Sequence, residues 1–274
     1  MLLILTCILQ RIYAAAGVRN EFVRFDPKTK EVKVFPTGNP LGNLQPFNDA
    51  WPYRTGMFFS QTTGNVINLF DYETTQVRTF QVPTPLAGPL GMIVASDGNL
   101  WFVEMLANKM AKLDTKTWKI TEYPLPASCF TPSVMRAETE GRYLWFTAIA
   151  TNSIGRFDMQ TGEAVAFSDP RLLATPIEDT VDSEGNIWYS TLTRNTLNYY
   201  TPSTGKFTTI DQPDESVNVV SGLLPSLPPA ADIAVHYEPS DNSIWFTELL
   251  NNRVGKYSIG GTAAKGGSAA PKGY

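Results

Sequence analysis

The sequence predicts an all-β fold, specifically a β-propeller of about six four-stranded blades in which the first and last blades are incomplete. Three observations support this prediction. A tryptophan-centred segment recurs along the chain, tight-turn dipeptides precede it, and the 274 residues include 20 glycines, 20 prolines and 12% aromatic residues. A period near 44 residues with about four strands per unit is typical of propeller blades. Six asparagines, spaced 45, 43, 44, 43 and 57 residues apart, mark the repeat: Asn20, Asn65, Asn108, Asn152, Asn195 and Asn252.

Each unit should begin with an innermost strand that turns back into the tryptophan strand. Acid-glycine pairs stand before the tryptophans, as in Asp97-Gly98, Glu140-Gly141 and Glu184-Gly185. Glycine accepts positive φ and closes a tight hairpin. The second strands then start at Trp101, Trp145, Trp188 and Trp245, with Tyr13 and Met57 in the two earlier copies.

The third and outer strands should be joined by a turn that an aspartate caps. Asp26, Asp71, Asp114 and Asp158 stand six residues after the repeated asparagines, and a threonine follows three residues later. Aspartate side chains stabilise such turns by accepting from nearby amides. Prolines then stand where each outer strand should end, because a residue without an amide hydrogen suits that place: Pro36, Pro83, Pro124, Pro170 and Pro213.

The ends of the chain define the expected domain limits. Residues 1–10 form an apolar segment that is either signal-like or the innermost strand of the first blade, residues 11–258 form a single propeller domain, and residues 259–274 form a flexible tail rich in Gly, Ala and Lys. The widest interval between repeats holds an insertion, residues 213–229, rich in proline and apolar residues. Long loops on a rigid propeller tend to cover the mouth of its channel.

Composition excludes several classes of protein. The formal charge is −4 and the pI about 5.2, which argues against a nucleic-acid partner. Two cysteines, Cys7 and Cys129, are too few for a disulfide framework. The nine residues at the start are too short to span a membrane as a helix, and they leave both a cytoplasmic and a secretory location open.

Several carboxylates should gather where the innermost strands begin and the tryptophan strands end. The residue three positions after each tryptophan, called the slot residue below, is Glu104, Ala148, Thr191 or Glu248. We predict Glu104, Glu248, Glu178 and Asp232 as catalytic acids or bases. Glu248 and Asp232 are also candidate ligands for Mg²⁺ or Ca²⁺, although the predicted chemistry can proceed without a cofactor.

The same openings carry apolar and polar side chains suited to a small hydrophobic substrate. The predicted substrate-binding residues are Phe47, Asn48, Trp51, Tyr53, Leu90, Met92, Ser133, Ile177 and Thr191. For most of the aromatic residues, core packing is the competing explanation. The expected state of the protein is a monomer or a weak homo-oligomer.

The segments GPLGMIVASDGNLWFVE, NKMAKLD and ITEYPLP resemble the virginiamycin B lyase group of propellers, and the resemblance covers roughly residues 11–258. The resemblance implies an enzyme that opens a cyclic depsipeptide by elimination, with a magnesium ion, a glutamate at the position of Glu248, and two histidines. Those histidine positions are here Ile177 and Ala231, and neither side chain can accept a proton. The only histidine, His236, should lie near the far end of an innermost strand. Streptogramin lyase activity by the family mechanism is therefore not expected.

Three functions remain open at this stage. The first is a small-molecule enzyme of natural-product metabolism that catalyses elimination, dehydration or cyclisation. Some fungal propellers similar to this group are hetero-Diels-Alderases, which catalyse such a cyclisation. The second is a metal-dependent lactonase or esterase of the gluconolactonase type. The third is a non-catalytic propeller that binds a ligand or a protein.

Overall fold

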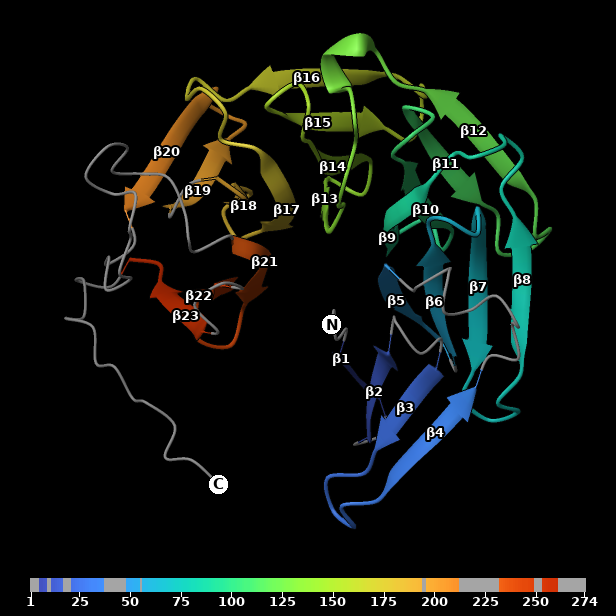
Figure 1. The fold of residues 1–274 in the computed structure, drawn as a ribbon. Coiled ribbons are helices and arrows are strands. Elements are labelled where there is room, and N and C mark those ends of the chain that lie inside the picture. Colours follow the sequence, from blue (N-terminus) through green and yellow to red (C-terminus); the bar gives the residue numbers. More distant parts are fainter. Residues whose placement is uncertain are drawn as a thin grey trace. The chain divides into compact units, whose positions relative to one another are not determined.

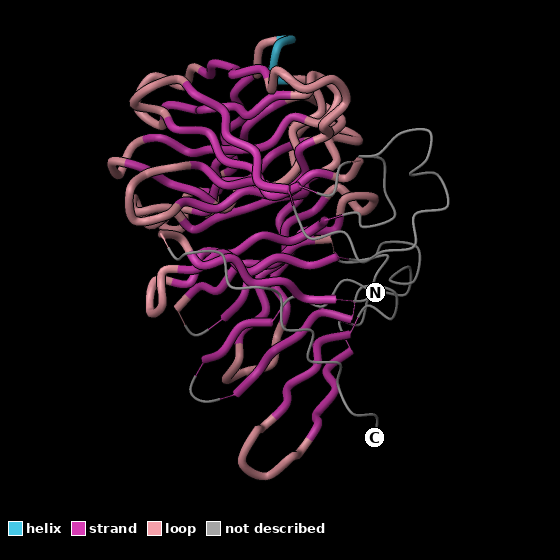
Figure 2. Tube along the Cα trace, turned by 90° about the vertical axis from the view of Figure 1, so that its left-hand side faces the viewer, coloured by secondary structure: helices cyan, strands magenta, loops and turns pink. Residues whose placement is uncertain are grey.

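The computed structural model describes residues 5–8, 11–16, 21–36, 48–54, 56–193, 196–211, 232–248 and 253–260. For residues 5–8 and 11–16, Pro36 and Asp232, it describes the backbone alone. The chain divides into two compact units, Met1–Ser168 and Asp169–Tyr274. Strands make up nearly all of the regular structure (Figures 1 and 2).

The first unit contains four antiparallel sheets of four strands each, in which every strand pairs with the one before it in the chain. We call them blades I to IV. Blade I is β1 (Leu5–Ile8), β2 (Arg11–Ala16), β3 (Glu21–Phe25) and β4 (Val32–Pro36); blade II is β5 (Asp49–Tyr53), β6 (Gly56–Gln61), β7 (Val66–Asp71) and β8 (Val77–Gln81); blade III is β9 (Pro89–Val94), β10 (Leu100–Glu104), β11 (Lys109–Leu113) and β12 (Ile120–Pro124); blade IV is β13 (Ala137–Thr139), β14 (Tyr143–Ala148), β15 (Ser153–Asp158) and β16 (Ala164–Ser168), preceded by the 3-10 turn η3 (Ala127–Cys129).

The second unit contains two sheets of the same design, blades V and VI. Blade V is β17 (Pro176–Val181), β18 (Ile187–Thr191), β19 (Thr196–Thr201) and β20 (Lys206–Asp211), and blade VI is β21 (Asp232–Glu238), β22 (Ser243–Glu248) and β23 (Arg253–Ser258).

The predicted blade count needs a correction. In the described part of the chain five blades have four strands, and the sixth sheet has three. The first blade is complete, because β1 supplies its innermost strand. The last sheet ends at β23 because the sequence pattern stops at Ser258.

The repeated asparagine stabilises the passage from one blade to the next. Asn65 and Asn108 have φ of 57° and 54° in the hairpin between the second and third strands. The amide of Asn65 donates to the carbonyl oxygens of Val82 and Thr84, at 3.2 and 2.9 Å, and its oxygen accepts from the backbone of Ala87 at 2.8 Å. Asparagine tolerates left-handed backbone and bonds neighbouring peptides. Asn108 makes the same kind of contact in blade III, where its amide donates to the carbonyl of Leu125 at 3.0 Å, so among the described residues the repeat marks a recurring clamp.

The other predicted turns are also found. Gly98, Gly141 and Gly185 adopt φ between 59° and 80° in the first hairpins of blades III, IV and V. Asp114 accepts from the backbone of Lys116 and Thr117, at 2.9 and 2.7 Å, in the last hairpin of blade III. Local sequence therefore sets each hairpin register.

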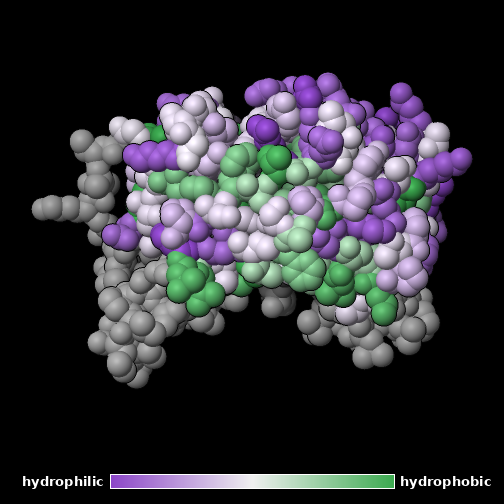
Figure 3. All heavy atoms as spheres, turned by 90° about the horizontal axis from the view of Figure 1, so that it is seen from above, coloured by the Kyte–Doolittle hydropathy of each residue, from purple (hydrophilic) through white to green (hydrophobic). Residues whose placement is uncertain are grey.

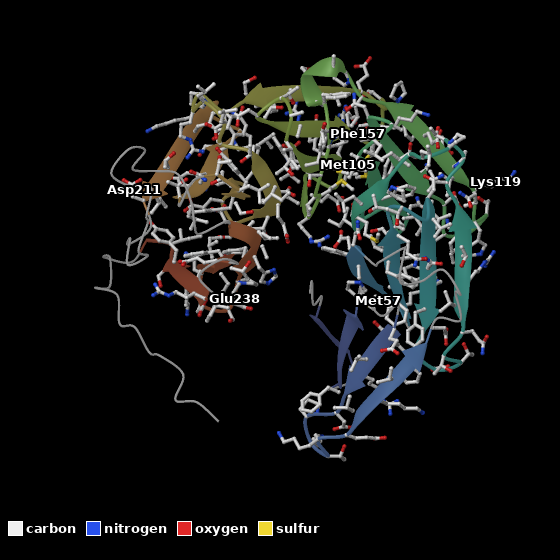
Figure 4. All side chains as sticks on the ribbon, viewed as in Figure 1. Met57, Met105, Lys119, Phe157, Asp211 and Glu238 are labelled. Carbon is white, nitrogen blue, oxygen red and sulfur yellow. The ribbon has the colours of Figure 1, made fainter. Side chains whose placement is uncertain are left out.

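Apolar cores lie between successive blades of a unit. One joins blades I and II and includes Phe22 and Met57, a second joins blades II and III, and a third joins blades III and IV and includes Trp101 and Phe157 (Figure 4). In the second unit a core around Trp188 joins blades V and VI. Basic side chains opposite the tryptophans cover the indole rings: Lys112 over Trp101, Arg156 over Trp145 and Lys256 over Trp245.

On the face seen in Figure 3, hydrophilic side chains are interspersed with separate hydrophobic patches. In the first unit Leu86, Leu106 and Phe130 are among the exposed hydrophobic residues. None of the helices in the described residues has the length and hydrophobicity needed to cross a bilayer.

Candidate functional site

One strand pairing recurs at the place where the sequence predicts the site. In blades III, V and VI the slot residue lies directly opposite the residue that opens the innermost strand, and such neighbours have Cβ atoms about 4.5–5.5 Å apart. The pairs are Pro89 with Glu104, Pro176 with Thr191, and Asp232 with Glu248. In blade II the slot residue is Ser60, three positions after Met57, and it lies opposite Asp49. In blade IV Ala148 lies opposite Pro132, which precedes the innermost strand. Within each blade, the two predicted sets of residues are therefore neighbours.

The slot residues differ in exposure. Ser60, Glu104, Ala148 and Thr191 are fully buried, whereas Glu248 is partly exposed. Of the described slot residues, Glu248 alone can meet a solute without a structural change.

A β-bulge follows the first pairing in blades III, V and VI. The bulges fall at Leu90 and Gly91, at Ile177 and Glu178, and at Ile233 and Ala234. Bulges redirect side chains and often lie beside active sites. In blade V this leaves Ile177 and Glu178 half-buried on β17, next to the fully buried Asp179.

The pairing corrects one position inferred from the family resemblance. Asp232 is level with Pro176, so the residue equivalent to Ile177 is Ile233 and not Ala231. Ile177 stands 11 residues before Trp188 and Ile233 stands 12 before Trp245, whereas Ala231 stands 14 before it. Neither Ile177 nor Ile233 can act as a base. His236 is exposed towards the far end of β21, as predicted.

In the second unit the acids predicted in blades V and VI lie on strands of two adjacent sheets. β17 packs beside β21, and the pairing places Glu248 opposite Asp232. Glu178 on β17 and Glu248 at the end of β22 thus belong to neighbouring inner regions of one unit. The side chain of Asp232 and the residues Phe47 and Ala231 lie outside the described residues.

In the first unit, Glu104 is buried beside a second carboxylate, Glu122. Burial, followed by repulsion from Glu122, raises the pKa of Glu104 to about 8. Burial also opposes ionisation of Glu122, but hydrogen bonds from Lys109 and Thr84 outweigh it and lower the pKa of Glu122 to about 2. At neutral pH Glu104 is therefore mostly protonated.

Other predicted substrate contacts in the first unit have structural partners. Asn48 donates to the hydroxyl of Thr62 at 2.5 Å, and that hydroxyl donates to the carbonyl of Pro89 at 2.8 Å. Met92 and Ser133 are fully buried, and Tyr53 is 9% exposed. Trp51 and Leu90 are partly buried beside the cores. The assignment of these residues and Thr191 to substrate binding stays a prediction.

A buried ion pair that the sequence did not reveal stabilises the inner strands of blades II to IV. Arg136 binds both carboxylate oxygens of Asp49, one of them at 2.7 Å, and donates to the carbonyl of Met92 at 3.0 Å. Its guanidinium lies 5.4 Å from the centre of the Trp51 ring. Asp49 is 2% exposed, so its charge is neutralised within the fold.

The second unit contains another polar network that was not predicted. The buried carboxylate of Asp169 accepts from Tyr189 at 2.6 Å and from Arg171. Burial opposes ionisation of Asp169, yet the hydrogen bonds from Arg171 and Tyr189 lower its pKa, while burial raises the pKa of Tyr189 above its usual range. The only sequence signal was the tyrosine itself, since three other repeats carry phenylalanine after the tryptophan.

The donor set for a metal ion is incomplete in the described part of the chain. No group of three or more His, Cys, Asp or Glu side chains is arranged there to hold an ion. The described residues alone therefore do not fit the magnesium site that the resemblance implies. The assignment of Glu248 and Asp232 as metal ligands stays a prediction.

Comparison with solved structures identifies the class of protein. A virginiamycin B lyase from Staphylococcus aureus matches with a TM-score of 0.77 and 21% identity, over 94% of this chain and 84% of that one. A catalytically inactive variant of that enzyme with quinupristin matches with a TM-score of 0.77 and 20% identity, over 93% and 83% of the chains. The chain is thus an all-β propeller, as the sequence predicted.

The sequence comparisons identify the family. The model of the Virginiamycin B lyase family matches residues 20–222, most of the chain, so the protein belongs to that family. A virginiamycin B lyase from Nocardia farcinica (strain IFM 10152) is 41% identical over 66 residues. That match covers 24% of this chain and spans 23% of the relative's length.

Proposed function

We propose that this chain is a lyase that acts on an apolar small molecule by elimination, with Glu248 as its catalytic acid or base. The observation that carries the proposal is the accessibility of Glu248, the partly exposed member of an otherwise buried set of slot residues. It also occupies the glutamate position of the WFTE segment in a chain that belongs to the Virginiamycin B lyase family.

The proposed step needs one base and a leaving group. The Glu248 carboxylate takes a proton from the carbon next to a carbonyl, the electron pair forms a carbon-carbon double bond, and the carbon-oxygen bond one position further breaks. In a cyclic ester the leaving oxygen departs as a carboxylate and the ring opens. In a β-hydroxy compound it departs as water after Glu178, on the neighbouring strand β17, supplies a proton.

A carboxylate base distinguishes this proposal from the mechanism that the family resemblance implies. The positions that the resemblance assigns to imidazole are apolar here, so Glu248 and Glu178 supply the proton transfers. Dehydration followed by cyclisation, as in a hetero-Diels-Alderase, is the finer form of the proposal, because such a step needs mainly a shaped apolar pocket and one proton donor.

Product mass tests the type of reaction. The protein is incubated with quinupristin, other cyclic esters and β-hydroxy ketones, and the products are analysed by liquid chromatography and mass spectrometry. Elimination gives a ring-opened product with the mass of the substrate, or a product lighter by one water, with a new conjugated absorbance. A product heavier by one water would instead identify a hydrolase and overturn the proposal.

Two matched variants test the role of Glu248 as the catalytic acid or base. We expect Glu248→Gln to lower kcat by at least about a hundredfold, because general acid-base catalysis contributes roughly 10²–10⁴. Glu184→Gln, in the exposed first hairpin of blade V, should retain the activity. Equal rates in the two variants would remove Glu248 from the mechanism, and binding without turnover by the unmodified protein would favour a non-catalytic propeller.

A further inference from the structure

Glu104 is a buried acid that the strand pairing of blade III leaves without a donor. It ends β10 opposite Pro89 on one side and Lys109 on the other, just before Met105, which is labelled in Figure 4. The residue is fully buried, and neither carboxyl oxygen receives a hydrogen bond in the described structure. An ionised carboxylate in such a place would be costly, so the site favours a carboxyl that keeps its proton.

Glu122 supplies the acceptor for that proton and also holds a segment of backbone. One of its oxygens accepts from the backbone amide of Thr84 at 2.8 Å, and the other accepts from the Thr84 hydroxyl at 2.7 Å. Lys109 donates to the same carboxylate at 2.9 Å and to the Thr84 hydroxyl at 2.6 Å. Thr84 belongs to residues 82–88, the crossover from β8 to β9, which leads directly into Pro89.

The charges around Glu104 make this arrangement sensitive to ionisation. The charged groups acting on Glu104 in the described structure are Glu122, which opposes its ionisation, and Lys109, which favours it less strongly. Pro89 faces it from β9 and brings no charge. Lys109 balances one negative charge in the pair, and a second carboxylate would be buried without a partner of its own.

We propose that Glu104 and Glu122 share one proton and form a pH-sensitive latch that fastens the crossover 82–88 to blade III. With the proton present, Glu104 donates to Glu122, and Glu122 in turn fixes Thr84. When solvent removes the proton, two buried carboxylates repel each other. Opening of the crossover relieves the repulsion because it admits water to Glu104.

A similar contact elsewhere in the same unit provides an internal comparison. Glu138 accepts from the backbone amide of Ser96 at 2.8 Å and from its hydroxyl, so it holds an exposed turn with the same chemistry. Ser96 is exposed and Glu138 is only half-buried, so water can solvate the Glu138 carboxylate. The Ser96 contact should therefore respond little to pH above 6.

Amide hydrogen exchange tests the latch on the intact chain, with rates corrected for the intrinsic effect of pH. Burial and Glu122 hold the pKa of Glu104 at about 8 in the closed form, against 4.5 when hydrated. We expect protection of the Thr84 amide to fall about tenfold per pH unit between about pH 5 and pH 8, and then to level off. Protection of the Ser96 amide should stay nearly constant from pH 6 to pH 8.

Two variants separate the latch from a general loosening of the fold. In Glu104→Gln the side-chain amide still donates to Glu122 but cannot ionise, so protection of Thr84 should not depend on pH. In Glu122→Gln the repelling charge is gone, so the fall in Thr84 protection should end at a lower pH. If Glu104→Gln does not fold, Glu122→Gln still gives the test. The proposal would be overturned if Thr84 protection in Glu104→Gln still fell with pH, or if the pH at which this fall ends were unchanged in Glu122→Gln. Equal pH dependence of protection at Thr84 and Ser96 would also overturn it.

Discussion

Replacement of Gly155 by alanine should destabilise the first unit, because an aromatic ring occupies the space where a side chain would go. Gly155 on β15 lies opposite Phe146 on β14. A Cβ atom on Gly155 would lie 2.1 Å from Cζ of Phe146 and 2.4 and 2.5 Å from the two Cε atoms. Phe146 is fully buried in the core between blades III and IV, so the ring has no open side to move into.

The size of the effect follows from these distances. Ordinary contact starts at 3.4 Å, so the ring must move by at least about 1.3 Å. Overpacking of a tight core costs roughly 1–3 kcal/mol, and alanine returns about 0.4–1 kcal/mol through the unfolded chain. We therefore expect a net loss of roughly 1–2 kcal/mol, which lowers Tm by about 2–8 °C in a protein of this size.

Chemical denaturation of the single and double variants measures this loss. Phe146→Leu should remove the clash, so the double variant should show a coupling energy of at least about 1 kcal/mol. Gly255→Ala makes the same 2.1 Å approach to Phe246, but Phe246 is 8% exposed, and its loss should be smaller. If the free energy of unfolding of Gly155→Ala lay within about 0.5 kcal/mol of that of the unmodified protein, the ring of Phe146 would not restrict this position.

Three further predictions concern buried ionisable groups. Arg136→Met should lower the free energy of unfolding by about 3–5 kcal/mol, because it leaves the charge of Asp49 buried and unpaired. In urea titrations the double variant with Asp49→Asn should recover more than half of that loss. Cys129 is fully buried, and burial raises the pKa of its thiol to about 11. In a Cys7→Ser variant, which leaves Cys129 as the single thiol, a thiol reagent at pH 8 should therefore label the native protein at least about a hundredfold more slowly than the unfolded protein. The pKa of Glu104 is about 8 in the fold and 4.5 ordinarily. The contribution of Glu104 to the free energy of unfolding is therefore fully present at low pH and is lost as the pH rises through 8. Between pH 6 and pH 8 the free energy of unfolding should fall by roughly 2 kcal/mol, and Glu104→Gln should abolish that fall, whereas an unchanged fall would contradict the assignment.

The repeat could be predicted because short-range chemistry produces it. An asparagine at positive φ, a glycine after an acid and an aspartate that caps its own turn each act within a few residues. Their spacing therefore predicted the hairpins and the end of each blade at which slot residues and strand entries lie. The strand count of the last blade followed from the same pattern, which stops at Ser258.

The candidate site was harder to predict because it depends on contacts between distant segments. Asp49 and Arg136 are 87 positions apart, and nothing near Asp49 announces its partner. Burial of Glu104 depends on the fold around it, and the acid beside it, Glu122, comes from the outer strand of the blade. Glu104 and Glu248 occupy equivalent positions in sequence but opposite environments, and sequence alone could not separate them.

The rate of alkene formation in Glu248→Gln, relative to Glu184→Gln, tests the proposed function most directly. With a substrate that the unmodified protein converts, we expect Glu184→Gln to convert it at an unchanged rate and Glu248→Gln at least about a hundredfold more slowly, with Km little affected. Full activity of Glu248→Gln would contradict the account.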